Sequence, residues 1–403
     1  MPRFLRRSPR PDKAEVRAPH VCVVGPGVRF LSGISYYTYG LASALARRGP
    51  VSVILLRELL PKRLYPGAAR VGQPLSDLAL PAEVDSFSKL DWFWIPSLLQ
   101  ALTFLRRRHD VLLLQWWTGT VLHTYLALAA ATRLLGGRVV IEFHEALDTG
   151  EDRLPWVRRY VKRVAPLLFG MADRFVVHSE FDRRLVSRRF NLPDDRIDTI
   201  PHATVDHYGK GGSWREAPED CCNLLFFGVI RPFKGLEDLI QAFGMIPEPE
   251  IKRYWLTVVG ETWEGWTAPN ELIAASPYRD RITFINRYVT DAEVRALFGG
   301  ADVVVLPYHR SSQSGPLHVA MQYGLPVVVS AVGGLVEAVE DYEGAFLTPA
   351  ADPGALLLAV DRAAGHRGRR FTHRRGWSHT VEAYATLFER LQRRRPPKPP
   401  RRS

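Results

Sequence analysis

Two basic side chains, Arg231 and Lys234, stand three residues apart directly after the hydrophobic run LLFFGVI. Where a buried strand ends at a cleft, two cations at this spacing suit a diphosphate whose negative charge has to be neutralised. Gly235 follows and opens a segment with helical periodicity. Taken alone, the segment is explained equally well by a solvated loop with two surface cations.

A second segment favours the phosphate interpretation. The hydrophobic run DVVVLP (302–307) is followed by the turn SSQSG (311–315) and by Pro316, a residue favoured in the first turn of a helix. The backbone N–H groups of Ser314 and Gly315 would then lie at a helix N-terminus, where free donors and the helix dipole attract anions. A plain strand-to-helix connection explains the Ser and Gly residues, but not their match with Arg231 and Lys234.

Four more polar residues follow predicted strands or turns. His144 lies in EFHE, His178 ends the next strand, Glu261 follows VVG and Glu337 follows GGLV. Each has a structural alternative, because a lone histidine is more often a hydrogen-bonding partner within the fold, and a glutamate can cap a helix.

Short Val, Ile and Leu runs alternate with amphipathic segments of helical length, which is typical of parallel strands buried on both faces. We expect strands at 21–24, 51–56, 111–115, 138–143, 174–179, 223–227, 255–260, 282–285, 302–307, 326–330 and 345–348. We expect helices at 34–48, 86–107, 119–135, 153–171, 180–189, 235–245, 291–299, 316–323, 353–364 and 377–391. The fold class predicted is α/β, with two doubly wound, Rossmann-like domains facing across a cleft that holds the ligand.

The predicted division of the chain rests on composition. Residues 19–206 form a first domain, the Gly-rich and charged segment 207–219 a linker, and residues 220–376 a second domain. A helix over 377–392 crosses back to the first domain. Residues 1–18 and 393–403 are basic tails rich in Arg and Pro, with too little apolar surface to fold, and we expect them to be disordered.

Charge excludes a basic groove through the fold. The chain has 54 Lys and Arg against 42 Asp and Glu, a formal charge of +12, but the two tails carry +10 of it. The body therefore has 42 basic and 40 acidic residues, and no nucleic-acid partner is expected. At 403 residues the chain exceeds the ~250–300 that one core usually organises.

Other features bear on the compartment. Three cysteines, Cys22, Cys221 and Cys222, make neither a disulfide framework nor the paired spacing of a zinc site, which fits a reducing cytoplasm. The first 18 residues lack the apolar core of a secretory signal. The uncharged stretch Val111–Thr132 is long enough to mimic a membrane span, but Gly119 and its polar residues divide it better into a strand, a turn and a helix.

Together these segments resemble the retaining glycosyltransferases of family four, which have the GT-B fold. The matching motifs, in order, are GPGVRFLSGISYYT (25–38), EFHE (142–145), ADRFVVHSE (172–180), IPHATVD (200–206), GVIRPFKG (228–235), VVGE (258–261), ADVVVLPY (301–308), GLPVVVSAVGGLVE (324–337) and the helix beginning at Trp377. The resemblance spans about residues 20–391. Each motif alone is weak, and their order makes the combination specific.

One departure concerns two glutamates that most of the family carries eight positions apart, one contacting the donor sugar and the other the ribose. Their places are taken here by Ser311 and Val319. The turn resembles a variant branch of the family with SQSG at this point, so we expect a substituted but active site. Loss of activity is the alternative.

The resemblance implies an enzyme of the hexosyl- and glycosyltransferase class. It would move a sugar from a nucleotide-diphosphate-sugar to an acceptor hydroxyl with retention of anomeric configuration. Arg231 and Lys234 would stabilise the departing diphosphate, together with the N–H groups of Ser314 and Gly315. Gly33 would let the backbone approach the same phosphate. His144 would contact the donor sugar, with a weaker case for His178, while Glu261 and Glu337 would bind the sugar or the nucleotide.

No cofactor or metal is expected. The nucleotide-sugar is a co-substrate, and the chain has no Asp-X-Asp triplet, the motif with which many other glycosyltransferases hold a divalent cation. Two alternatives remain open, a non-catalytic binding or scaffold protein and a nucleotide-sugar epimerase. The sequence GPG at 25–27 suggests a dinucleotide site, but Phe30 breaks the GxGxxG spacing.

The expected partners are the donor and an unknown glycan, lipid or small-molecule acceptor in polysaccharide or glycoconjugate biosynthesis. The protein is expected in the cytoplasm, where the basic tails would either tether it to the anionic inner face of the membrane or merely aid solubility. An aromatic cluster, Trp92, Phe93, Trp94, Trp116 and Trp117, would line an acceptor site, touch lipid, or pack in and around the first core.

Overall fold

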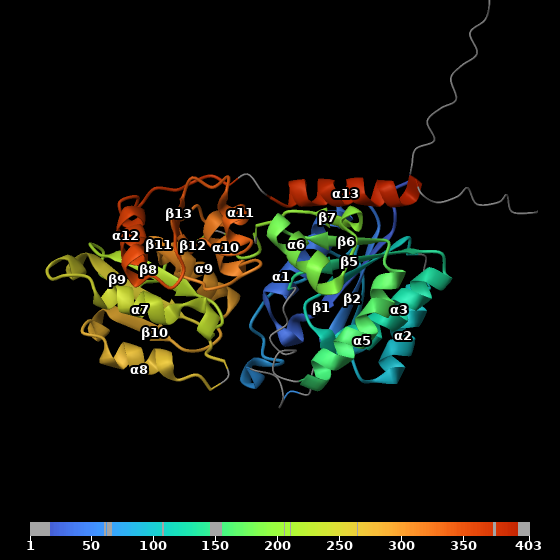
Figure 1. Cartoon of the computed structure of the whole chain (residues 1–403), viewed down its shortest axis with the longest axis horizontal. Helices are drawn as coiled ribbons and strands as arrows, with labels where there is room; N and C mark the ends of the chain where they lie inside the picture. The colour runs from blue at the N-terminus through green and yellow to red at the C-terminus, as the bar shows by residue number, and fades with distance from the viewer. Residues whose placement is uncertain are drawn as a thin grey trace, which may run out of the picture.

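A computed structural model of the chain describes residues 17–59, 62, 67–106, 109–145, 155–204, 206–209, 211–263, 265–373 and 376–393. It contains two parallel sheets side by side along the longest axis, each covered by helices (Figure 1). We call the parts built on them the first and second domains. Nearly all of both predicted tails lies outside the described residues.

The first sheet has the strand order β3-β2-β1-β4-β5-β6-β7. Its strands are β1 (Val21–Pro26), β2 (Val51–Glu58), β3 (Asp85–Asp91), β4 (Val111–Trp116), β5 (Arg138–Phe143), β6 (Arg174–Val177) and β7 (Ile197–Thr199). Its helices are α1 (Gly33–Ala46), α2 (Ile95–Leu105), α3 (Leu122–Leu134), α5 (Pro155–Met171) and α6 (Glu180–Phe190). The order reverses between β1 and β4, the topological point at which such sheets bind ligands.

The second sheet has the order β10-β9-β8-β11-β12-β13 and reverses between β8 and β11. Its strands are β8 (Cys222–Phe227), β9 (Tyr254–Val259), β10 (Ile282–Ile285), β11 (Val303–Leu306), β12 (Val327–Ser330) and β13 (Ala345–Thr348). Its helices are α7 (Leu236–Gly244), α8 (Ala268–Ala275), α9 (Asp291–Gly300), α10 (Gly315–Gln322), α11 (Leu335–Val339) and α12 (Pro353–Ala364).

Helices pack on both faces of the first sheet. On one face, α2, α3 and α5 lie side by side and share a hydrophobic core with alternate residues of the strands (Figure 1). On the other face, α1 packs beside the last helix, α13 (Trp377–Arg393). Tyr384 and Leu387 of α13 are fully buried there, so the end of the described chain returns to the first domain.

The hydrophobic strands lie where the sequence predicts them, within one or two residues. The predicted helix at 86–107 is wrong in its first part, because residues 85–91 form the edge strand β3. That strand is mostly exposed and reads DSFSKLD, so it lacks the apolar run of a central strand. The same reason explains why the short edge strand β7 was not predicted.

The uncharged stretch at 111–132 is a strand, a 3-10 turn and a helix, as predicted. No helix in the described ranges combines the length and the apolar character needed to cross a bilayer.

Candidate active site

Arg231 and Lys234 lie in the loop after β8, beside the end of the neighbouring strand β11. The Lys234 ammonium is 3.7 Å from the centroid of the Tyr308 ring, just beyond β11. The Arg231 guanidinium lies 5.5 Å from the centroid of the Trp263 ring. Both cations are only partly buried, and both rest on aromatic faces beyond the carboxyl ends of the strands.

The N-terminus of α10 meets the same loop. Ser314 caps the helix, its hydroxyl oxygen accepting the Leu317 N–H at 3.4 Å, and the Ser314 hydroxyl donates to the Tyr308 hydroxyl at 3.4 Å. Tyr308 therefore touches both Lys234 and Ser314. The structure thus brings together the two segments that the sequence predicts to form a phosphate site.

Gly235 fixes the loop against the end of β11. Its φ of +64° is a left-handed conformation that favours glycine, and a Cβ there would lie 1.9 Å from the Pro307 carbonyl oxygen. No larger residue fits without moving the backbone. The position of Lys234, one residue earlier, follows from this close packing.

Two glycines that begin helices face open space instead. A Cβ added to Gly33, the first residue of α1, or to Gly315, the first of α10, would meet no atom of the described chain within 4 Å. Neither has the positive φ that would require glycine for the backbone. The fold alone therefore does not explain these glycines, whereas a ligand that closely approaches both helix N-termini would.

His144 and His178 belong to a buried cluster around Glu142 of β5. Their Nε2 atoms lie 3.5 and 3.6 Å from the two carboxylate oxygens, and neither Nε2 has a hydrogen-bond partner among the described residues. Glu142 itself is fully buried and accepts hydrogen bonds from the Tyr384 hydroxyl and, at 3.2 Å, from Gln115 Nε2. The sequence predicts a sugar contact for these histidines; the structure gives them a carboxylate neighbour.

The cluster continues as a row of imidazoles into the second domain. The ring centroid of His178 is 5.0 Å from that of His144 and 5.2 Å from that of His202. His202 in turn stacks on His318 of α10, with centroids 4.4 Å apart and planes at 11°. His318 Nε2 lies 3.2 Å from Gln313 Oε1 in the SSQSG turn. The row therefore links the first-domain cluster to the helix whose N-terminus is the predicted phosphate site.

Burial and neighbouring groups set the charges of this row. Burial would raise the pKa of Glu142, but the nearby imidazoles and the Tyr384 hydroxyl outweigh it and lower that pKa to about 2. Burial and the His144 imidazole lower the pKa of His178 to about 4. Burial, with the neighbouring imidazoles, also places the pKa of His202 well below its ordinary value. At neutral pH the cluster thus holds an anionic carboxylate beside neutral His178 and His202.

Glu337 and Glu261 both make contacts between the domains. The Glu337 carboxylate accepts the backbone N–H groups of Glu180 and Phe181 at 2.6 and 2.8 Å, so it caps α6 of the first domain. Glu261 accepts the Trp263 indole N–H at 2.9 Å and lies 3.6 Å from Arg70 of the first domain. Their predicted contacts with the donor stay predictions, and in this arrangement both carboxylates already have partners.

Asp291 at the start of α9 is a further contact between the domains. Its carboxylate accepts hydrogen bonds from Ser76 at 2.6 Å, from the Asp77 N–H at 3.1 Å, and from the Tyr36 hydroxyl. His207 Nε2 lies 2.8 Å away. Burial would raise the pKa of Asp291, but these partners lower it to about 2. A polar node, not apolar packing alone, therefore holds this part of the interface.

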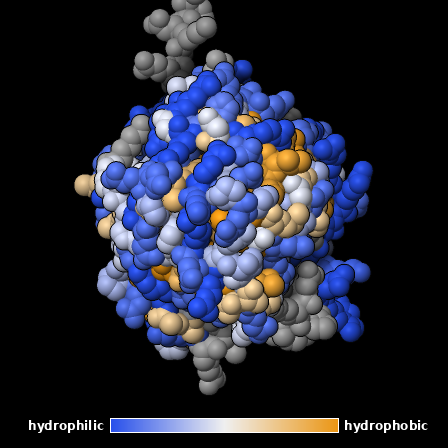
Figure 2. Space-filling model, turned by 90° about the vertical axis from the view of Figure 1, so that its left-hand side faces the viewer, coloured by the Kyte–Doolittle hydropathy of each residue, from blue (hydrophilic) through white to orange (hydrophobic). Residues whose placement is uncertain are grey.

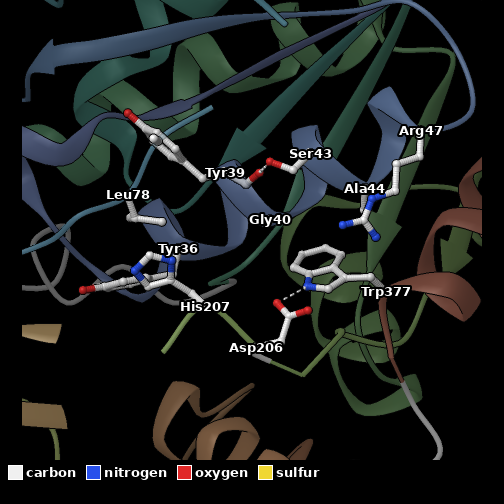
Figure 3. A pocket seen from close by; sticks show the side chains of 11 residues that line it. Tyr36, Tyr39, Gly40, Ser43, Ala44, Arg47, Leu78, Asp206, His207 and Trp377 are labelled. Carbon is white, nitrogen blue, oxygen red and sulfur yellow. Dashed lines mark hydrogen bonds between the residues drawn. The ribbon is translucent and has the colours of Figure 1, made fainter. Parts of the chain in front are cut away.

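A pocket of about 130 Å³ opens beside this node (Figure 3). Figure 3 shows side chains of α1, the segment at 206–207 and Trp377 around it, with the Trp377 indole N–H donating to Asp206 at 3.1 Å. Its lining is Tyr36, Tyr39, Gly40, Ser43, Ala44, Arg47, Leu78, Ala79, Asp206, His207 and Trp377. None of the predicted donor residues is among them, so this pocket is separate from the predicted phosphate site.

The two positions that lack the family's glutamates are structural. The Ser311 hydroxyl donates to the Gln313 carbonyl oxygen at 2.8 Å, which closes the turn. Val319 is 4% exposed and packs in the core of the second domain. Neither side chain offers a charged group to a ribose or a sugar.

Two groups of side chains have the composition and spacing of metal ligands. Glu142, His144 and His178 form one, and Asp77, His207 and Asp291 form the other, with ligand atoms within 4.8 Å of one another in each. In both groups a carboxylate already accepts hydrogen bonds from other side chains. Neither group includes a residue of the predicted phosphate site.

No pattern in the sequence singles out Asp291, Arg70 or His318. The Arg70 guanidinium lies 5.3 Å from the Trp263 ring centroid and 4.4 Å from that of Tyr288. This first-domain cation therefore contacts two aromatic rings of the second domain. These contacts join segments that are far apart in the chain, and no local pattern marks them. His202 lies within the motif IPHATVD, but only the fold places it against His318.

Two family models match the chain. The one described as a glycosyl transferase 4-like domain matches residues 32–203, and the one described as glycosyl transferases group 1 matches residues 221–366. The D-inositol 3-phosphate glycosyltransferase of Mycolicibacterium gilvum is 25% identical over 431 aligned positions, which cover 95% of this chain and 90% of that protein.

Solved structures show the same fold. The catalytic domain of starch synthase IV from Arabidopsis thaliana, bound to ADP and acarbose, matches 94% of this chain and 99% of its own, with a TM-score of 0.65 and 14% identity. The Anabaena protein HepE in complex with UDP-glucose matches 93% of this chain and 100% of its own, with a TM-score of 0.59 and 16% identity. At such identities the likeness concerns the fold.

Proposed function

The chain belongs to family four of the glycosyltransferases and has their GT-B fold, and from this we propose that it transfers a sugar from a nucleotide-diphosphate-sugar to an acceptor hydroxyl. The anomeric carbon loses its bond to the phosphate oxygen, which departs with the bonding electrons, and gains one to the acceptor oxygen. The acceptor hydroxyl gives up its proton to the departing phosphate oxygen. We propose that the configuration at the anomeric carbon is retained, as in the family.

The observation that carries the proposal is the meeting of Lys234 with the N-terminus of α10. The ammonium lies over the ring of Tyr308, and the Ser314 hydroxyl contacts the hydroxyl of the same side chain. A diphosphate beside them would meet a cation and the free backbone N–H groups of a helix together. Donors that are in place before charge develops are the most effective way to stabilise a leaving group.

Each residue of the site then has a role. Arg231 and Lys234 neutralise the diphosphate, the Ser314 and Gly315 N–H groups bind its oxygens, and Gly33 admits it close to the start of α1. His144 contacts the donor sugar, since it follows β5 and is held in place by Glu142. His178 supports His144 from the next strand.

We propose that this transfer needs no metal ion. Two cations beside the helix N-terminus supply the positive charge that a divalent ion supplies in other transferases. Turnover should therefore be the same with excess EDTA as with added magnesium. A strong dependence on magnesium would contradict this part of the proposal without affecting the donor class.

A donor screen tests the main proposal. The full chain is heated with UDP-, GDP- and ADP-sugars in turn, because a ligand that binds only the folded state raises the melting temperature by mass action. The best donor is then incubated with candidate acceptors, among them inositol phosphates and sugar phosphates, and the anomeric configuration of the product is read by NMR. We expect one donor to stabilise the chain and to be consumed.

A non-catalytic binding protein is the second candidate, and the structure of the SSQSG turn is the observation that favours it. Ser311 and Val319 take structural positions where the family has carboxylates. This candidate predicts that a nucleotide-sugar binds but is neither hydrolysed nor transferred with any acceptor tested.

A further inference from the structure

The outer surface formed by α2, α3 and α5 has a composition unlike the rest of the body. The three helices contain no aspartate or glutamate, and their five charged residues are all basic. Elsewhere the body balances acids and bases almost equally. Arg133 of α3 pairs with Asp173, just after α5, at 2.7 Å, and the other four cations of these helices point to a partner that carries negative charge.

Exposed apolar side chains are frequent on the same three helices and at their ends. Of the fourteen large hydrophobic residues that are exposed in the described part of the chain, seven lie on these helices or at their ends. They are Phe93, Trp94, Ile95, Leu99, Leu134, Leu135 and Leu167. Phe93 and Trp94 are each 55% exposed and Ile95 is 69% exposed, directly at the start of α2.

Four cations lie on α5 of the same surface. Arg158, Arg159, Lys162 and Arg163 are all exposed, while Val157, Val161 and Ala165 face the core. The helix is therefore strongly amphipathic, with a charged face of a single sign. This is the pattern of helices that lie on anionic membranes with their basic residues among the headgroups.

The basic and apolar parts are structurally joined. Helix α3 packs against both α2 and α5, and His123 Nε2 of α3 contacts the Trp92 carbonyl oxygen just before the aromatic turn. The three helices lie side by side on one side of the first sheet (Figure 1). Figure 2 gives the contrast: at the end of the molecule formed by the second domain, hydrophilic residues cover most of the face and the hydrophobic areas are small and separate.

We propose that the surface of α2, α3 and α5 docks the protein on an anionic lipid bilayer. Phe93, Trp94 and Ile95 enter the interfacial region, where aromatic side chains are favoured, and the α5 cations pair with lipid phosphates. Docking is a property of the first domain and does not depend on the proposed sugar transfer. If that transfer also occurs, the acceptor is one that the membrane presents, such as a lipid-linked glycan.

Cosedimentation with vesicles tests the proposal. The full chain is mixed with vesicles of phosphatidylglycerol and phosphatidylcholine in equal parts, or of phosphatidylcholine alone, at low and high salt. We expect binding to the first at low salt and much weaker binding to the others, because attraction to surface charge is screened. If the full chain binds neither kind of vesicle, the proposal is wrong.

Three variants of the full chain locate the surface. Replacing the four α5 cations by glutamine should weaken binding at least about a hundredfold, since each cation near the surface contributes about fivefold. Trp94→Ser with Ile95→Ser should weaken it about tenfold or more. Leu358→Ser is the matched control, because Leu358 of α12 is 69% exposed, like Ile95, but lies on the second domain.

The outcomes separate the alternatives. Equal binding by the cation variant and the unchanged chain overturns the proposal. A further variant replaces only basic residues of the tail by glutamine: Arg394, Arg395, Lys398, Arg401 and Arg402. Loss of vesicle binding in that variant also overturns the proposal. Light scattering measures whether the chain is a dimer. If the chain is a dimer, Trp94→Ser with Ile95→Ser makes it a monomer, and the chain binds no vesicles, then a second copy of the chain occupies this surface. Circular dichroism checks folding, and nucleotide-sugar binding without vesicles reports on the proposed function separately.

Discussion

The Glu142 cluster of the first domain and the cation site of the second domain are polar in different ways. Around Glu142, a buried carboxylate already has hydrogen bonds from Tyr384 and Gln115 and two imidazoles beside it. At Arg231 and Lys234, cations rest on aromatic rings beside a helix N-terminus and open space. In the first arrangement side chains already hydrogen-bond the carboxylate, whereas the second presents positive charge beside open space.

This difference separates stability from function. The hydrogen-bond partners of a buried carboxylate offset the free-energy cost of burying its charge. Removing the carboxylate leaves several buried polar groups without a partner, which destabilises the fold. A partly exposed cation contributes little to folding, and its charge becomes important when a phosphate binds. Substitutions in the two regions should therefore affect different measurements.

The largest effect is expected from Glu142→Ala. Removing the carboxylate leaves the Tyr384 hydroxyl and Gln115 without their acceptor, and removes the group beside which His144 and His178 lie. We expect the free energy of unfolding to fall by about 3–5 kcal/mol, measured by denaturation with urea. Glu382→Ala on the exposed face of α13 is the control and should change it by less than about 0.5 kcal/mol. A similar small change in Glu142→Ala would mean that the cluster is not a structural centre.

Lys234→Ala should lower turnover strongly and the free energy of unfolding only slightly. Loss of the ammonium should lower kcat for donor cleavage by about 10²–10³-fold, the range seen when one stabilising donor of a transition state is removed. The free energy of unfolding should fall by only about 1 kcal/mol, the contribution of the contact with Tyr308. Arg231→Ala should behave in the same way.

The exposed Lys252→Ala in the same domain provides the control for charge and should leave kcat unchanged. If Lys234→Ala, Arg231→Ala and the double variant all turn over like the unchanged chain, the site proposed for the diphosphate is wrong.

Gly33→Ala tests whether the donor phosphate approaches the start of α1. A methyl group meets no atom of the described chain there, and alanine favours helix over glycine by up to ~1 kcal/mol, so folding should be unharmed. Donor turnover should fall about tenfold or more, because the methyl group would stand where the phosphate approaches. Gly170→Ala in α5 is the matched control, since a Cβ there also meets no described atom within 4 Å. Unchanged turnover in Gly33→Ala would falsify the approach of the donor to α1.

The sequence was most informative where a local pattern determines the structure. Arg231, Lys234 and Ser314 lie beyond the ends of adjacent parallel strands, so the strand pattern alone brings their segments to one edge of the second sheet. The SSQSG turn and Pro316 likewise predicted the start of α10 correctly.

Contacts between the domains were not predictable in the same way. Glu337 caps a helix about 157 residues earlier in the chain, and Asp291 binds a tyrosine of the first domain. Such pairs depend on how two separately folded sheets are placed, which no periodicity encodes. The edge strand β3 was not predicted for a different reason. Most of its residues are exposed, so its sequence is polar and lacks the apolar run that marks a buried strand.

The pH dependence of stability again distinguishes the two regions. Burial and His144 lower the pKa of His178 to about 4 in the folded state, while an unfolded histidine titrates near 6.5. Between these values the unfolded chain binds more protons, so the free energy of unfolding should fall as the pH drops from about 6.5 to 4. Glu142, with a folded pKa of about 2, adds a further loss below about 4.5.

Urea denaturation at a series of pH values measures this dependence. Each depressed histidine contributes a slope of up to ~1.4 kcal/mol per pH unit, so His178→Asn should flatten the profile between pH 6.5 and 4. His379→Asn, on the exposed face of α13, should leave the slope as it is. Lys234→Ala should also leave it unchanged, because Lys234 is not part of the Glu142 cluster. An unaltered slope in His178→Asn would show that acid sensitivity arises outside the Glu142 cluster.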